Sequence, residues 1–101
     1  MRITDKPLVI AVWVMPGCGA CEEYLPRFRQ VAGRYSRCVP SVIIDATKNE
    51  EAANAFRVKA TPTTMVVRNG RRGAFSIEGS ADAERIEELY SYAFFGLDCK
   101  I

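Results

Sequence analysis

The apolar and polar positions in the first third of the chain predict one strand followed by one helix. Residues 8–14 read LVIAVWV, and an unbroken apolar run with β-branched residues is typical of a strand covered on both faces. After Cys18 the apolar residues recur at helical spacing, at Cys21, Tyr24, Leu25, Phe28, Val31 and Ala32. Charged residues fill the positions between them, which predicts an amphipathic helix over residues 18–32. Gly33 is the expected end of this helix, and Pro26 is expected to kink it.

The middle of the chain predicts a second strand and a short helix. Residues 38–45 read CVPSVIID, with Pro40 near the start, where a strand tolerates proline. Thr47 is followed three residues later by Glu50, a spacing typical of a capping box that begins a helix. We expect that helix to run to about Phe56.

The last third of the chain predicts a hairpin and a final helix. Residues 61–79 read TPTTMVVRNGRRGAFSIEG, and Asn69-Gly70 is a strong signal for a tight turn between two strands. Ser80 or Asp82 is the expected N-cap of the final helix, and Gly96 is its expected end. The apolar stripe of this helix comprises Ile86, Leu89, Tyr90, Ala93 and Phe94.

The predicted order of elements is strand, helix, strand, helix, strand, strand and helix. A parallel βαβ unit followed by a hairpin and a helix gives an α/β fold, a mixed four-stranded sheet with helices on both faces. The chain has 101 residues, so we expect one domain over residues 1–101.

Composition and charge narrow the function classes. The 14 basic and 12 acidic residues are mixed along the chain and give a net charge of +2, so we expect no nucleic-acid partner. The chain has no histidine, which removes the commonest general base and the commonest metal ligand. The apolar run from Leu8 is far shorter than the roughly 20 residues that cross a bilayer, so we expect no membrane partner. Because this run leads directly into the Cys18 region, we interpret it as a strand rather than a signal peptide and expect a non-secreted, cytoplasmic protein.

Four cysteines carry the candidate chemistry, and two residues separate Cys18 from Cys21. This spacing alone allows a metal clip, a structural disulfide or a working redox pair. Cys38 and Cys99 do not form the second close pair that a four-cysteine zinc site needs, so we expect no metal and no other cofactor. A CxxC at the start of the helix that follows a strand favours the redox interpretation.

With this motif in this context, the chain resembles the thioredoxin family from Leu8 to about Tyr92. The resemblance rests on features in a fixed order, namely Cys18-Gly19-Ala20-Cys21 at a strand-to-helix junction, Pro26 five residues later, Asp45 closing a strand, a proline segment and hairpin over Phe56–Gly70, and Gly79 before the last helix. It implies a thioredoxin-like fold and a thiol–disulfide oxidoreductase that reduces or exchanges protein disulfides.

Several positions depart from the family pattern. Because 17 residues precede Cys18, we expect the family's first strand and helix to be missing or reduced to a segment near residues 2–6. Gly17 stands where many thioredoxins have tryptophan, and Val12 stands where thioredoxin itself has a buried aspartate. The dipeptide between the cysteines is Gly-Ala, neither the Gly-Pro of thioredoxins nor the Pro-Tyr of glutaredoxins. A glutaredoxin-like, glutathione-dependent reductase and a binding module without turnover therefore remain as alternatives.

The residues around the motif account for the expected chemistry. Cys18 lies at a predicted helix N-terminus, where unpaired backbone N–H groups and the helix dipole favour a thiolate. Cys21, one turn further along, is the expected resolving thiol, which attacks the mixed disulfide formed by Cys18. Because no buried aspartate is expected near Cys21, the candidate acceptors of its proton are water, the leaving thiolate and Glu22. Gly17 and Gly19 add no bulk beside Cys18, so a partner's disulfide is expected to approach there, over a surface that also includes Ala20.

The resemblance also implies a substrate groove. By that resemblance the Thr61–Pro62 peptide bond is cis and lies next to Cys18, and Gly79 belongs to the same groove. The implied partners are disulfide-containing proteins, with a reductase or glutathione for recycling, and we expect a monomer.

The family pattern does not explain Cys38 and Cys99. In the family layout, the helix after Cys18 and the last helix both run away from the active-site end of the sheet. Cys38 and the tail that carries Cys99 are therefore both expected at the opposite end, with Cα atoms within disulfide reach, roughly 4.4–6.8 Å. A structural disulfide between them is a hypothesis, and two unrelated thiols are its alternative.

Overall fold

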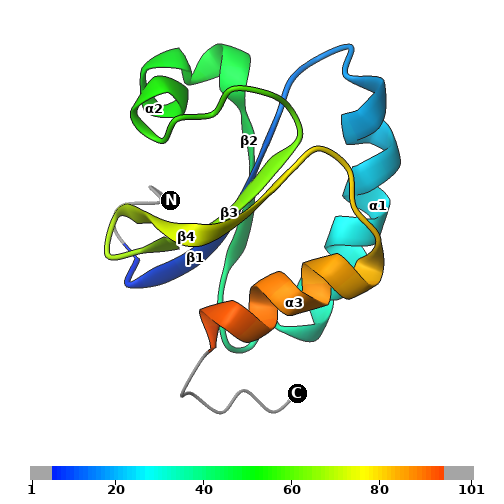
Figure 1. Cartoon of the computed structure of the whole chain (residues 1–101), viewed down its shortest axis with the longest axis vertical. Helices are drawn as coiled ribbons and strands as arrows, with labels where there is room; N and C mark the ends of the chain where they lie inside the picture. The colour runs from blue at the N-terminus through cyan, green and yellow to red at the C-terminus, as the bar shows by residue number, and fades with distance from the viewer. Residues whose placement is uncertain (1–5, 95–101) are drawn as a thin grey trace.

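The computed structural model describes residues 6–94, which form a four-stranded sheet with helices on both faces (Figure 1). The strands are β1 (Leu8–Val14), β2 (Ser41–Asp45), β3 (Thr63–Arg68) and β4 (Arg71–Glu78). The helices are α1 (Gly19–Arg34), α2 (Glu50–Ala55) and α3 (Ala83–Ala93), with a short 3-10 helix η2 (Ala46–Lys48) before α2. The α/β fold expected from the sequence is confirmed.

The strands lie in the order β2-β1-β3-β4, with β1 parallel to β2 and antiparallel to β3. Because β1 has a neighbour on each side and helices on both faces, its residues from Val9 to Trp13 are fully buried, which explains its unbroken apolar sequence. The hairpin between β3 and β4 turns at Asn69 and Gly70, whose φ values of 53° and 78° suit a type I′ turn.

Alternate residues of β1 face two separate apolar cores. Ile10 and Val12 face the core that the sheet forms with α1 and α3, which lie side by side in Figure 1. Val9, Ala11 and Trp13 face the opposite side, where α2 contributes Ala53. Because one strand anchors both cores, the start of α1 is held at a fixed place at one end of the sheet.

The junction between α1 and β2 differs from the prediction. α1 continues through Gly33 to Arg34, because Tyr35, the residue after it, stacks on Tyr90 of α3 with ring centroids 4.7 Å apart. The backbone N–H groups of Cys38 and Val39 then donate to the carbonyl oxygen of Tyr35, at 2.9 and 3.0 Å. These bonds close a turn, so β2 begins at Ser41 rather than at Cys38.

The predicted capping box of Thr47 and Glu50 does not form. The backbone N–H and the hydroxyl of Thr47 both donate to the Asp45 carboxylate, at 2.8 and 2.6 Å, and α2 begins after Asn49. The hydroxyl of Thr47 is the main cause of a lowered pKa of Asp45. Asp45 therefore caps η2, and the chain starts α2 only after this extra turn.

Of the two predicted N-cap residues of the final helix, Ser80 and Asp82, the structure has Asp82. The Asp82 carboxylate accepts a hydrogen bond from the backbone N–H of Arg85 at 2.9 Å, and α3 ends at Ala93. Gly96, its predicted end, and residues 2–5 of the expected remnant at the start of the chain lie outside the described residues.

Candidate active site

Cys18 lies at the N-terminus of α1, at the end of the sheet where β1 stops. It is the N-cap residue, and its Sγ accepts a hydrogen bond from the backbone N–H of Cys21 at 3.0 Å. The two cysteines form a disulfide, with Cα atoms 5.2 Å apart. Cys18 is half-buried, whereas Cys21 is 2% exposed. Cys18 is therefore the sulfur that another molecule can reach.

The segment before β3 lies directly against Cys18. The hydroxyl of Thr61 donates to Cys18 Sγ at 3.5 Å, and the carbonyl oxygen of Thr61 lies 3.6 Å from the same sulfur. The Thr61–Pro62 peptide bond is cis. The carbonyl of Pro62 in turn accepts a hydrogen bond from the backbone N–H of Gly79 at 2.7 Å. The segment around Thr61 thus lies against the sulfur, and Gly79 is bonded to that segment on its other side.

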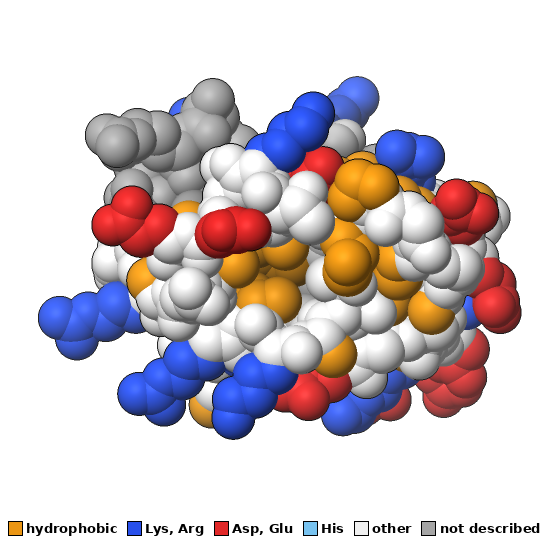
Figure 2. All heavy atoms as spheres, turned by 90° about the horizontal axis from the view of Figure 1, so that it is seen from above, with side chains coloured by type: hydrophobic (Ala, Val, Ile, Leu, Met, Phe, Trp, Pro, Cys, Tyr) orange, Lys and Arg blue, Asp and Glu red, His pale blue; other side chains and the backbone are white. Residues whose placement is uncertain are grey.

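Small residues leave the surface around Cys18 open. Gly17, Gly19 and Ala20 are exposed, and a Cβ atom added at Gly17, Gly19 or Gly79 would meet no other atom within 4 Å. Gly17 and Gly79 have φ values of 77° and 90°, in the left-handed region that favours glycine. In Figure 2, which looks onto this end of the molecule, apolar side chains gather around a hollow and charged side chains lie at its margin. The end of the molecule that carries Cys18 is therefore open and apolar at its centre.

The charged residues near the motif remain in solvent. Glu22 and Glu23 in the first turn of α1 are exposed, as is Lys59 before the Thr61 segment. Within residues 6–94, none of the three takes part in an ion pair. Over the same residues there is no group of three or more cysteine or acidic side chains arranged to hold a metal ion, and no helix is long and apolar enough to span a membrane.

Two contacts near the site were not predicted from the sequence. The hydroxyls of Tyr24 and Thr64 share a buried hydrogen bond of 2.8 Å between α1 and β3, and burial raises the pKa of Tyr24. Arg27 donates from its guanidinium group to the backbone carbonyl of Ala81 at 2.5 Å. Tyr24 belongs to the predicted apolar stripe of α1, and Arg27 is one of the charged residues between the apolar positions. The partners of these two residues lie 40 and 54 residues away along the chain. The local pattern of apolar and polar positions carries no information about contacts at such separations.

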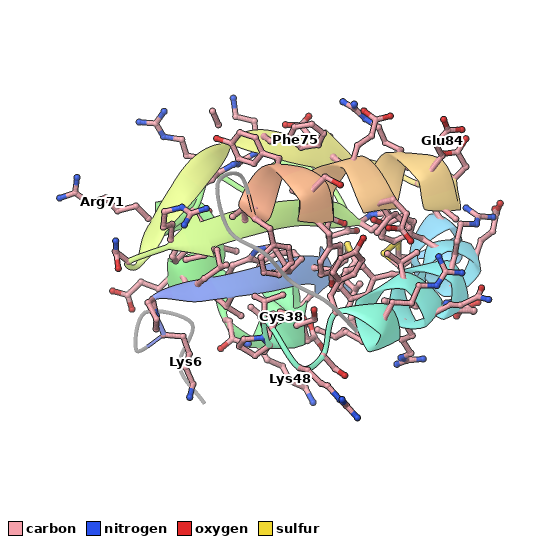
Figure 3. All side chains as sticks on the ribbon, turned by 90° about the horizontal axis from the view of Figure 1, so that it is seen from below. Lys6, Cys38, Lys48, Arg71, Phe75 and Glu84 are labelled. Carbon is pink, nitrogen blue, oxygen red and sulfur yellow. A yellow bond between two sulfur atoms is a disulfide. The ribbon has the colours of Figure 1, made fainter. Side chains whose placement is uncertain are left out.

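Cys38 lies far from the Cys18–Cys21 pair. Figure 3, which looks at the opposite end of the sheet, labels it in the turn between α1 and β2. It is half-buried against the core that α1 and α3 cover. Cys99 lies outside the described residues, so the disulfide between these two cysteines stays a prediction.

The sequence matches known proteins along most of its length. The family model described as Thioredoxin matches residues 1–91. Thioredoxin-1 of Drosophila yakuba is 32% identical over 90 residues, which cover 88% of this chain and 81% of that protein. A protein disulfide-isomerase of Datisca glomerata is 31% identical over 89 residues, but the match covers only 18% of that protein. The chain thus spans less than a fifth of the length of this larger relative.

Solved structures give the same result for the fold. The germline-specific thioredoxin Deadhead of Drosophila melanogaster aligns with a TM-score of 0.76 and 28% identity, over 88% of this chain and 83% of that one. The oxidised thioredoxin of Plasmodium falciparum aligns with a TM-score of 0.74 and 23% identity, over 90% and 86% of the two chains. With the family model matched over residues 1–91 and the fold shared along most of the chain, this protein belongs to the thioredoxin family.

Proposed function

We propose that this protein is a thiol–disulfide oxidoreductase that reduces or exchanges disulfides of protein substrates through Cys18 and Cys21. The observation that carries the proposal is the position of Cys18 Sγ. It lies half-buried at a helix N-terminus and receives the backbone N–H of Cys21, with Cys21 buried one turn behind it. A sulfur held in this way is stabilised as a thiolate when the pair is reduced.

Reduction of a substrate disulfide then takes two steps. The Cys18 thiolate attacks one sulfur of the substrate; a bond forms between them as the substrate's S–S bond breaks, and the first substrate thiolate leaves and takes up a proton. Cys21 loses its proton and attacks Cys18 Sγ, which forms the Cys18–Cys21 disulfide and releases the second substrate thiolate. The substrate gains two electrons and two protons, and the dithiol of the protein loses them. The same steps run in reverse when the protein oxidises a dithiol.

Protein substrates suit the site because the surface around Cys18 is open and is formed by several segments. Gly17, Thr61 and Gly79 are each at least partly exposed, and an extended chain that crosses them brings its disulfide to Cys18. Recycling of the oxidised pair by a dedicated reductase or by glutathione, a cytoplasmic location and a monomeric state are further parts of the proposal, and they rest on the sequence.

Trapping tests the proposed function. In Cys21→Ser, Cys18 can attack a substrate but nothing resolves the mixed disulfide, so covalent complexes through Cys18 should accumulate and disappear on reduction with dithiothreitol. Cys18→Ser and the double variant are the matched controls and should trap nothing. Wild-type protein should reduce insulin disulfides, and Cys18→Ser should lose this activity. Activity that survives in Cys18→Ser would contradict the assignment of the nucleophile, and a binding module would trap no partner in any variant.

Two electron donors distinguish the recycling routes. A glutathione-dependent enzyme should turn over with glutathione as the only reductant, whereas a thioredoxin-type enzyme should need a thioredoxin reductase and NADPH. The rate measured with each donor separates the two.

A further inference from the structure

The two helices on the Cys18 side of the sheet are tied together by side chains at two separate places. Away from the site, Glu87 of α3 accepts hydrogen bonds from Arg34 at 2.6 Å and from Tyr35 at 2.5 Å. Nearer the site, the Arg27 guanidinium donates to the carbonyl of Ala81, just before α3 begins. At a rise of about 1.5 Å per residue, Arg27 is about 10 Å closer than Arg34 to the Cys18 end of α1. Figure 3 shows α3 running alongside α1, with Glu84 marking the first turn of α3.

Ala81 belongs to the loop over residues 79–82, which joins β4 to α3. At its start, Gly79 donates its backbone N–H to Pro62 at 2.7 Å, and at its end Asp82 caps α3. Between these two points, the hydrogen bond from Arg27 connects the loop to the helix that carries both cysteines. The loop is therefore fixed on one side to the segment around Pro62 and on the other side to α1.

The chemistry of Arg27 suits this connection. It lies on the face of α1 between buried and exposed positions, and its side chain is half-buried, so its apolar stem packs while its charged end reaches the loop. A hydrogen bond from a charged guanidinium to a carbonyl is stronger than one between neutral groups, and the planar group holds its direction. Glutamine at this position is shorter and neutral, and it loses the bond.

We propose that Arg27 is a positioning residue that sets the affinity of the active site for protein substrates. By holding the carbonyl of Ala81, it keeps Gly79 and the loop beside Pro62 in place as one wall of the substrate groove. An extended substrate chain contacts this wall, whereas a small disulfide reaches Cys18 without touching it. Arg27 thereby raises the preference for protein disulfides over small ones. This inference rests on the proposed function, since it assigns a role to Arg27 at that same site.

The test compares two substrates in two matched variants. Arg27→Gln removes the bond to Ala81, and Arg29→Gln removes the same charge from an exposed position two residues along α1. For Arg27→Gln we expect the KM for insulin disulfides to rise about three- to tenfold. This is less than the full strength of a charge-assisted hydrogen bond, because the bond to Ala81 orders the loop and does not itself touch the substrate. The kcat for insulin and both constants for hydroxyethyl disulfide should stay near those of the wild type. Arg29→Gln should change none of them.

The restriction of the KM change to insulin is the reading that a merely structural role would not give, and hydrogen exchange measures directly how firmly the loop is held. In Arg27→Gln the backbone amide of Gly79, which donates to Pro62, should exchange faster, while that of Glu22 in the first turn of α1 keeps its protection. A KM that rises equally for both substrates, an equal effect of Arg29→Gln, or unchanged exchange of the Gly79 amide would each overturn the proposal. Where Arg27→Gln does not fold, Arg27→Lys keeps the charge and the apolar stem and should give a smaller rise in KM, again confined to insulin.

The outcomes also separate this inference from the proposed function. A wild-type protein that reduces neither substrate contradicts the proposed function itself. A wild-type protein that reduces both, with the same ratio of KM values in Arg27→Gln, contradicts the role of Arg27 alone.

Discussion

Thr61→Val removes one of the two donors directed at Cys18 Sγ and keeps the size and β-branching of the side chain. The backbone N–H of Cys21 at 3.0 Å remains, while the hydroxyl at 3.5 Å is lost. A hydrogen bond to a charged group contributes about 1.5–3 kcal/mol, and this one is long and half-exposed, so we take about 0.5–1.4 kcal/mol. That energy corresponds to a rise of roughly 0.4–1 unit in the pKa of the Cys18 thiol in the reduced protein.

The change in rate is smaller than the change in thiolate population. At a pH below both pKa values, the thiolate fraction falls roughly 2.5- to tenfold, but a thiolate of higher pKa is the better nucleophile, with a Brønsted coefficient of about 0.4–0.5. The rate of attack on a disulfide should therefore fall about two- to fourfold.

Thiolate absorbance in the ultraviolet, followed during a pH titration of the Cys21→Ser protein with and without Thr61→Val, measures the change in pKa. Stopped-flow attack on a small aromatic disulfide measures the change in rate. Thr64→Val is the matched control, because it removes a nearby hydroxyl that bonds to Tyr24 rather than to Cys18. An unchanged pKa in Thr61→Val, or an equal shift in Thr64→Val, would refute the assignment of this hydroxyl to the thiolate.

Three further predictions concern other contacts, two tested by substitution and one by counting thiols. Tyr24→Phe leaves its threonine partner on β3 buried without a hydrogen bond, so the free energy of unfolding in urea should fall by about 1–2 kcal/mol, and an unchanged value would contradict the importance of this contact. The hydrogen bond to Glu87 raises the pKa of Tyr35 from 10.0 to about 12, so its contribution to stability is present below pH 10 and is lost as the pH rises toward 12. Tyr35→Phe should make thermal unfolding less dependent on pH in this range, and an unchanged dependence would refute the linkage. If Cys38 and Cys99 are bridged, oxidised protein unfolded in denaturant should react with no thiol reagent, whereas two reactive thiols would exclude the bridge.

The sequence predicted the elements whose residues follow one strong period. The unbroken apolar run of β1 and the helical spacing of α1 both appear in the structure at the expected places. Boundaries were less predictable where tertiary contacts compete with local signals. Gly33 is a reasonable helix end by itself, but the stacking of Tyr35 on Tyr90 keeps that turn helical. Thr47 and Glu50 have the spacing of a capping box, but the backbone N–H and the hydroxyl of Thr47 both donate to Asp45 instead.

Some residues of the candidate site could likewise be predicted from the local sequence, and others could not. The spacing of Cys18 and Cys21 and their place before a helix were visible locally, and they indicated redox chemistry. The place of Thr61 beside Cys18 followed from the family resemblance, because only a known fold brings such distant segments together. Arg27 had neither signal. The hydrogen bond of Arg27 to Ala81 forms only because the loop before α3 passes close to α1, and this proximity arises from the packing of the whole structure.

Loss of the proton from Cys21 shows how burial limits the possible mechanisms. Val12, at the position of the family's buried aspartate, is fully buried opposite Thr64, and the buried polar side chains within residues 6–94 are threonines rather than carboxylates. Glu22 is adjacent to Cys21 on α1, and consecutive helix residues point in different directions, so Glu22 is exposed while Cys21 is covered. The hydroxyl of Tyr24 is bonded to Thr64, and burial keeps it protonated. With Glu22 directed into solvent, water and the departing substrate thiolate remain as the acceptors of this proton.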